Sequence, residues 1–238
     1  SQPGEFKPYW NVGLAGGVNH LFQPIVHATM PQLGGHVGLS GEYHFTPYSG
    51  VRLTADYAQL VNGMEYKDNL MEYSLTHVNT GIDYMFDLST LFAGYTPNRR
   101  VDVLLAAGPV LSTKISAPEE LNWRFDRTAL GMQVGIPVQY HFNSSWGVSF
   151  EPRAQFFRHD VGLWKVAESY SLPYATLKGD PERILNLQLG VKYTPDAPFR
   201  SRMEALDKYL EMLKKHNVYY LTSGELADLY YQGWSERR

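Results

Sequence analysis

The stretch LGMQVGIPVQYHFNSSWGVSFEPRAQF, residues 130–156, decides the fold. Apolar side chains alternate with small or polar ones on both sides of the short segment 143–145. A period of two is typical of β-strands, in which successive side chains point to opposite faces. Aromatic residues gather beside the connector, at Tyr140, Phe142 and Trp146. The stretch therefore predicts two antiparallel strands joined by a tight turn, with aromatic side chains next to that turn.

The same alternation appears in eight segments between residues 9 and 193, and the connectors between them alternate in length. The short or intermediate connectors cover residues 46–50, 87–99 and 143–145, and the long ones residues 19–35, 59–74, 113–127 and 158–182. Up-and-down barrels of the outer membrane have short periplasmic turns and long extracellular loops. We therefore expect an eight-stranded antiparallel up-and-down outer-membrane β-barrel with both termini in the periplasm of a Gram-negative bacterium.

A soluble up-and-down barrel such as a lipocalin would also show alternating strands. The face opposite the apolar one is rich in Gly, Ala, Ser and Asn, which fit a narrow eight-stranded lumen better than an outer surface. Aromatic residues on the apolar face fall at corresponding strand ends, as the interfacial girdle of a membrane barrel does. The predicted girdle consists of Trp10, Tyr43, Phe45, Tyr84, Phe86, Tyr140, Phe142, Trp146 and Tyr193.

Composition narrows the functional classes. The chain of 238 residues has 17 Tyr, 11 Phe, 5 Trp and 21 Gly, and it has no Cys. The absence of Cys excludes thiolate metal sites, disulfides and an acylated N-terminal cysteine. A net charge of −3 without a basic stripe argues against nucleic acid. Residues 1–7 lack the features of a secretory signal, which we expect to be absent or already removed.

After Tyr193 the alternation ends and a helical pattern begins. Ser201 and Glu204 have the spacing of a capping box, and an apolar stripe follows at intervals of three and four residues. This stripe consists of Met203, Leu206, Leu210 and Leu213. We therefore expect two regions, a barrel over residues 1–194 and a short α-helical periplasmic tail over residues 195–238.

The segment DLSTLFAGYTPNRRVDVLLAAG, residues 87–108, resembles the barrels of OmpA-like outer-membrane proteins of the Bacteroidota. In that family a similar aromatic-Gly-Tyr-x-Pro element, followed by Arg, joins strands four and five on the periplasmic side. The resemblance covers about residues 8–194. Larger members carry a globular peptidoglycan-binding domain after the barrel, and the residues after Tyr193 are too few for it. The resemblance therefore implies the barrel, and it does not imply attachment to the cell wall.

Charged residues on the inward face form the first group of candidate site residues. Unpaired charges in a narrow lumen are costly, so we expect an ion-pair network across strands, with Arg52 bound to Glu42 or Asp56. The predicted network consists of Glu42, Arg52, Asp56, Asp83, Asp102, Glu151, Arg153 and Lys192. A metal site is conceivable at the inward histidines His36, His44, His77 and His141. They lack HxH or HxxxH spacing, so hydrogen bonding is the favoured role, and no cofactor is predicted.

Apolar residues outside the barrel wall form the second group. Trp123 and Trp164 lie in expected loops, and the tail stripe needs a surface to cover it. These features favour a non-enzymatic structural or accessory subunit that lies among lipid and lipopolysaccharide and docks other outer-membrane or periplasmic proteins. The alternative is a lipid-modifying or hydrolytic enzyme, although no catalytic set of nucleophile, base and acid is visible. A narrow passive pore is a third possibility.

Overall fold

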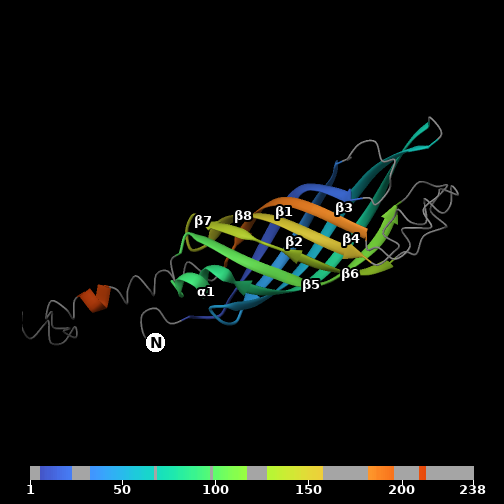
Figure 1. Cartoon of the computed structure of the whole chain (residues 1–238). Helices are drawn as coiled ribbons and strands as arrows, with labels where there is room; N and C mark the ends of the chain where they lie inside the picture. Colours follow the sequence, from blue (N-terminus) through green and yellow to red (C-terminus); the bar gives the residue numbers. More distant parts are fainter. Residues whose placement is uncertain are drawn as a thin grey trace, which may run out of the picture. The chain divides into compact units, whose positions relative to one another are not determined.

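The computed structural model describes residues 6–22, 33–66, 69–96, 99–116, 128–157, 182–195 and 209–212. The chain divides into two units, one over Phe6–Ala197 and the other over Ser1–Glu5 with Pro198–Arg238. The first unit is a β-barrel (Figure 1). In the second unit, the described residues 209–212 are helical, as the sequence predicts there.

Nine labelled strands and one short helix, α1 Leu88–Ala93, make up the described part of the barrel unit. The strands are β1 Tyr9–Phe22, β2 Leu33–His44, β3 Ser49–Tyr66, β4 Asn69–Asp87, β5 Val101–Ser116, β6 Thr128–Gly135, β7 Val138–His141, β8 Trp146–Phe157 and β9 Glu182–Tyr193. Because β6 and β7 both lie between β5 and β8, the nine strands occupy eight positions. Every pairing is antiparallel and β1 pairs with β9, which closes the ring. The predicted eight-stranded up-and-down barrel is confirmed.

Two prolines explain the break between β6 and β7. The register against β8 is the same on both sides of the break, from Gly135 opposite Arg153 to Val138 opposite Phe150. The Ile136 N–H donates to the Pro152 carbonyl (3.1 Å), and the Leu104 N–H donates to the Pro137 carbonyl (2.9 Å). Neither proline has an N–H with which to return the bond. The wall therefore keeps its register but loses two ladder hydrogen bonds at neighbouring points.

The connector between β3 and β4 differs from the prediction. The sequence predicts a long loop over residues 59–74, but the two strands stay paired up to Tyr66 opposite Asn69. Only residues 67–68 join them. Beyond Ala58 and Thr76 the two strands pair, among the described residues, only with each other, which satisfies the backbone groups on their facing edges. Since about 9–11 residues suffice to cross a bilayer, this hairpin continues beyond the ring (Figure 1). Most of the other three long connectors lies outside the described residues.

The connectors at the opposite end are compact. We call this end the turn end, and the end with the long connectors the loop end. In the β2–β3 turn, the Thr46 hydroxyl accepts from the Ser49 N–H (2.9 Å). In the β7–β8 turn, the Asn143 side chain accepts from the N–H groups of Ser145 (2.8 Å) and Trp146 (2.9 Å). Such side-chain-to-backbone bonds are the reason Asn and Thr favour turns.

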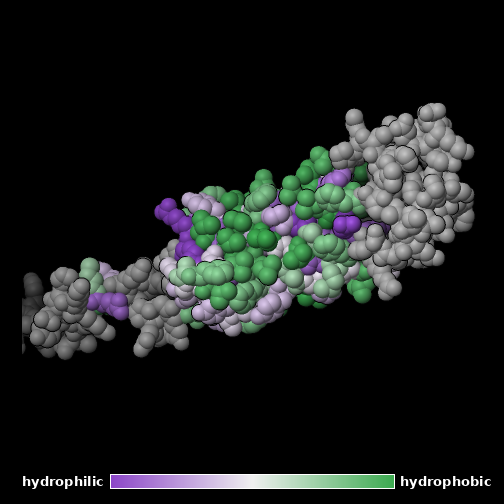
Figure 2. All heavy atoms as spheres, in the orientation of Figure 1, coloured by the Kyte–Doolittle hydropathy of each residue, from purple (hydrophilic) through white to green (hydrophobic). Residues whose placement is uncertain are grey.

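The two faces of the wall have opposite character. Outward side chains are apolar and exposed, with Leu39 at 64%, Leu130 at 69% and Leu189 at 68%. Inward positions include Arg52, Asp83 and other charged residues that are almost fully buried. Apolar residues cover much of the visible wall in Figure 2. A soluble barrel would have these faces reversed, so the fold is a transmembrane barrel of the outer-membrane type.

Among the described residues, no helix is both long enough and apolar enough to cross a membrane.

The predicted aromatic girdle lies at the turn end. Trp10 is opposite Tyr43 in the β1–β2 pair, and Trp146 is opposite Tyr193 in the β8–β9 pair. The rings of Trp146 and Tyr193 have centroids 4.7 Å apart, and those of Tyr140 and Phe142 are 5.5 Å apart. The nine girdle residues thus occupy the same rim of the wall, as an interfacial band requires. Their depth in a bilayer stays a prediction.

Candidate functional site in the barrel lumen

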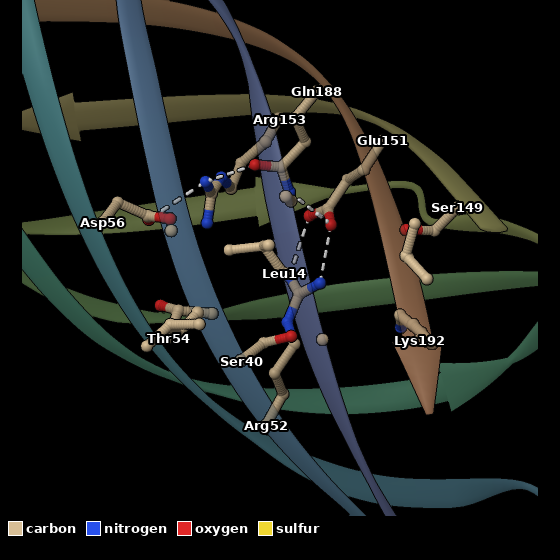
Figure 3. Close-up of a pocket in the computed structure, with 15 residues that line it drawn as sticks. Leu14, Ser40, Arg52, Thr54, Asp56, Ser149, Glu151, Arg153, Gln188 and Lys192 are labelled. Carbon is tan, nitrogen blue, oxygen red and sulfur yellow. Dashed lines mark hydrogen bonds and ion pairs between the residues drawn. The ribbon is translucent and has the colours of Figure 1, made fainter. Parts of the chain in front are cut away.

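Arg52 on β3 is the centre of the lumen. Its guanidinium donates two bonds to Glu151 on β8, Nη1 to Oε2 (2.6 Å) and Nη2 to Oε1 (2.8 Å). On its other side it bonds Asp83 of β4, with Nε to Oδ2 at 2.9 Å. All three side chains are at most 4% exposed. Figure 3 shows Arg52 pointing across the lumen toward Glu151.

The prediction that Arg52 pairs with Glu42 or Asp56 is wrong. Glu42 is the Cα partner of Arg52 on β2, but its carboxylate forms an ion pair with Lys192 of β9. The Glu42 carboxylate also lies 3.4 Å from the His44 ring nitrogen. Adjacency in the sheet therefore does not decide the pairing, because long side chains in a narrow lumen reach the opposite wall.

A second cluster surrounds Arg153 on β8. Its guanidinium lies 3.1 Å from the Asp56 carboxylate of β3 and donates to the Gln188 amide oxygen of β9 (2.9 Å). The Gln188 amide nitrogen donates to Glu151 (2.9 Å), which links this cluster to Arg52. Figure 3 shows Gln188 between the two charged groups. One hydrogen-bonded network thus ties β3 to β8 and β9 across the lumen.

Asp102 lies apart from this network. Its carboxylate, near the turn end, is 2.9 Å from the His141 ring and 4.0 Å from Arg99. The Asp102 side chain is 22% exposed, whereas those of the central acids are almost fully buried. Seven of the eight predicted charges therefore share the central lumen, and Asp102 belongs to its rim.

A chain of neutral amides completes the lumen. The Gln133 amide donates to Asp83 (2.8 Å), Gln155 donates to Gln133 (3.1 Å), and Asn186 donates to Gln155 (3.1 Å). Each of these side chains is at most 4% exposed. The sequence prediction names only charged inward residues and therefore omits these three amides. All three lie at inward-facing positions in the alternation of β6, β8 and β9, and this position is the signal that identifies them.

Glycines in the wall make room for the polar side chains. A Cβ built on Gly38 would lie 1.9 Å from the Asp56 carboxylate, and one on Gly135 would lie 2.4 Å from that of Glu151. A Cβ on Gly81 would lie 2.5 Å from the Gln133 amide nitrogen. Real Cβ atoms do not approach so closely, so these glycines are positioning residues for the network.

A cavity of about 20 Å³ lies between the network and the inner faces of β1 and β2, with Ser40, Thr54 and Ser149 among its lining residues (Figure 3). This volume suits about one water molecule. Toward the loop end, inward apolar side chains form a further layer that is at most 5% exposed. The layer consists of Leu21, Leu60, Leu75, Phe157 and Ile184.

Each of the four inward histidines has a polar partner. The rings of His36 and His77 lie 3.1 Å from the Gln188 oxygen and 3.2 Å from the Ser112 hydroxyl, and His44 and His141 face Glu42 and Asp102. Within the described part of the chain, no group of three or more His, Asp or Glu side chains could hold a metal ion.

The predicted partner-binding residues fall mainly outside the described residues. Leu210 lies in the helical segment 209–212, where its neighbours Tyr209 and Met212 are 54% and 49% exposed. Trp123, Trp164, Met203, Leu206 and Leu213 lie outside the described ranges.

No protein-family model and no curated protein matches the chain. The solved structures similar to it include Neisserial surface protein A (14% identity, 77% of this chain and 96% of that one, TM-score 0.49). Others are Ail of Yersinia pestis (13% identity, 79% and 99%, TM-score 0.42) and the N-terminal barrel of Pseudomonas aeruginosa OprF (13% identity, 79% and 100%, TM-score 0.43). The assignment as a transmembrane barrel of the outer-membrane type rests on the closed strand order and on the two faces of its wall.

Proposed function

We propose that the protein is a non-enzymatic accessory barrel of the outer membrane. Its wall anchors it, and its loops and C-terminal tail dock other outer-membrane or periplasmic proteins, with both termini in the periplasm. The observation that carries this proposal is the two-bond contact between Arg52 and Glu151, which crosses the lumen beside a described cavity of about 20 Å³. In this proposal the polar network inside the barrel stabilises the fold. The function is carried by the parts of the protein outside the bilayer.

The apolar layer at the loop end supports the same proposal. Leu60 and Phe157 lie on the inward face beyond the ion pairs and are 4% and 0% exposed. Ions would have to pass the ion-pair network and then this apolar layer, whose side chains give a desolvated ion little compensation. Transport through the lumen is therefore a poor candidate for the function.

The tail supports the docking part of the proposal. A barrel satisfies its backbone groups within the wall and needs no additional helix to remain in the membrane. The sequence stripe of Met203, Leu206, Leu210 and Leu213 makes one side of the tail apolar. Helical units as small as this tail rarely hold together alone. A protein partner at the barrel's periplasmic end would cover the stripe.

Truncation after Thr194 tests the proposal. Full-length and truncated proteins are purified in mild detergent without crosslinking, and co-purifying proteins are compared by quantitative mass spectrometry. We expect the truncated barrel to keep its heat-dependent mobility shift on gels and to lose partners. A full-length variant with Leu206→Glu and Leu210→Glu should lose the same partners, because charge in an apolar interface is costly.

The matched control carries Lys208→Glu and Lys215→Glu, which add the same side chain to the polar side of the predicted helix. It should keep the partners that the stripe variant loses. If the truncated protein retains all its partners, docking through the tail is wrong. Replacing Trp123 and Trp164 in the loops would then test the other docking surface named in the proposal.

A further inference from the structure

Helix α1 has its apolar face outward. Leu88, Leu91 and Phe92 follow the i, i+3, i+4 spacing that places side chains on one side of a helix. Leu91 is 51% and Phe92 is 83% exposed, whereas the polar Thr90 on the other side is 4% exposed. A surface helix in water normally buries its apolar side and exposes its polar one. Helix α1 does the reverse.

The helix is held firmly in this orientation. Asp87 caps its start, accepting from the Thr90 N–H (2.8 Å) and the Thr90 hydroxyl (2.9 Å), and Gly94 ends it with φ 75°. The Asp87 N–H donates to the Tyr48 carbonyl (2.8 Å) of the β2–β3 turn. The Ser89 hydroxyl accepts from the Val103 N–H (2.7 Å) of β5. Bonds to two other parts of the barrel thus fix which side faces outward.

The helix continues the lipid-facing surface of the wall. Tyr84 and Phe86, the last outward residues of β4, belong to the predicted girdle, and α1 begins two residues after Phe86. Figure 1 shows α1 at the turn end, where β4 ends and β5 begins. After the helix come Arg99, which bonds the Gly94 carbonyl, and the exposed Arg100. The apolar side chains of α1 thus follow the girdle, and an exposed cationic side chain follows them closely in sequence. This combination is typical of segments at the boundary between the hydrocarbon layer and the lipid headgroups.

We propose that α1 is an interfacial membrane anchor. Leu91 and Phe92 enter the edge of the hydrocarbon layer of the leaflet at the turn end, and Arg100 binds the phosphate of an anionic phospholipid there. Lipid is favoured over a protein partner because the exposed apolar side follows directly on a wall that already faces lipid. This anchor involves only the turn end of the wall and is independent of docking by the tail.

Site-directed spin labelling tests the depth of α1 directly, because the chain has no Cys. Phe92→Cys and, as a matched control in the turn 143–145 at the same end, Ser144→Cys are labelled and placed in nanodiscs of phosphatidylethanolamine and phosphatidylglycerol. Collision of each label with dissolved oxygen and with a water-soluble nickel chelate is measured. We expect the nickel collision rate at position 92 to be several-fold lower than at position 144, and the oxygen rate to be higher.

The samples contain only the purified protein, the lipids and the scaffold protein of the nanodisc, so no outer-membrane or periplasmic partner can cause the protection. If the label at position 92 collides with nickel as readily as the label at position 144, the side is in water and the anchor proposal is overturned in favour of a protein docking surface. A retained heat-dependent mobility shift verifies that both variants are folded.

The lipid headgroup is tested separately with Arg100→Gln. Native mass spectrometry of the protein, released from discs with equal amounts of the two lipids, measures how much phosphatidylglycerol stays bound. We expect the wild type to retain it preferentially and Arg100→Gln to lose most of that preference. An outward Arg183→Gln on β9, near the loop end, should keep it. An unchanged preference in Arg100→Gln would overturn the assignment of the phosphate to Arg100.

Discussion

Arg52 and Glu151 lie 99 positions apart in the chain and face each other across the lumen through two hydrogen bonds of 2.6 and 2.8 Å. Their strands, β3 and β8, are not neighbours in the ring. Bidentate pairs of Arg with a carboxylate are among the stronger and more directional polar contacts. This pair stabilises the cross-section of the barrel, because it joins two strands that no backbone hydrogen bonds connect.

Arg52→Ala should strongly destabilise the barrel. It leaves Asp83 and Glu151 without their cation, and breaking a buried pair in this way costs about 3–5 kcal/mol. Urea unfolding in lipid vesicles measures the loss, and Arg183→Ala on the exposed side of β9 is the control. The double variant Arg52→Ala with Glu151→Ala should cost less than the sum of the two single changes. Additive losses would show that the two residues are not coupled.

Gly38→Ala should destabilise the protein by displacing the Asp56 carboxylate, which a Cβ would approach to 1.9 Å. Overpacking of this kind costs about 1–3 kcal/mol. Gly41→Ala, on the same strand, is the matched control because a Cβ there meets nothing within 4 Å. Equal stability of the two variants in urea unfolding would contradict the positioning role of Gly38.

Val134→Arg should reveal the depth of the lipid-facing wall. Val134 lies near the middle of the β6–β7 stretch on the outward face, where an Arg costs about 2–4 kcal/mol. Phe142→Arg, beyond the end of β7 in the predicted girdle, should cost about 0–1 kcal/mol. The measurement is the free energy of unfolding in vesicles of defined thickness. Similar losses at both positions would argue that the wall does not span the bilayer.

Pro152→Ala should close a gap in the barrel wall. The new N–H can donate to the Ile136 carbonyl and so complete the pair that the Ile136 N–H already forms with residue 152 (3.1 Å). We expect the Ile136 amide to exchange its hydrogen several-fold more slowly in nanodiscs, as measured by NMR. Amides of the β2–β3 pair around Leu53 serve as the reference and should not change. Unaltered exchange at Ile136 would mean that the proline does not weaken this part of the wall.

The wild-type protein in a planar lipid bilayer should show no steady opening on the nanosiemens scale. The ion-pair network and the apolar layer that includes Phe157 act as two barriers in series. Single-channel recording over a range of voltages checks this, with an empty-detergent preparation as the control. Large and stable openings would contradict a closed lumen and favour the passive-pore alternative.

The sequence by itself determined the barrel and the direction of its side chains. Period-two alternation sets which residues share a face, and a strand cannot change this without moving every side chain to the other face. The alternation alone therefore assigns Arg52, Asp83 and Glu151 to the lumen. The aromatic residues at strand ends likewise indicate a membrane barrel, because local patterns of this kind depend only on neighbours along the chain.

The tertiary structure decided which of these side chains meet. Arg52 pairs with Glu151 rather than with Glu42, because ring closure brings β8 opposite β3 and because Lys192 already binds Glu42. The hairpin around residues 67–68 and the outward apolar side of α1 are likewise not predictable from alternation. Each depends on pairing or bonding between segments that are separated along the chain. Alternation along one strand sets the face on which a side chain lies, and only the closed ring sets the distance between two side chains on that face.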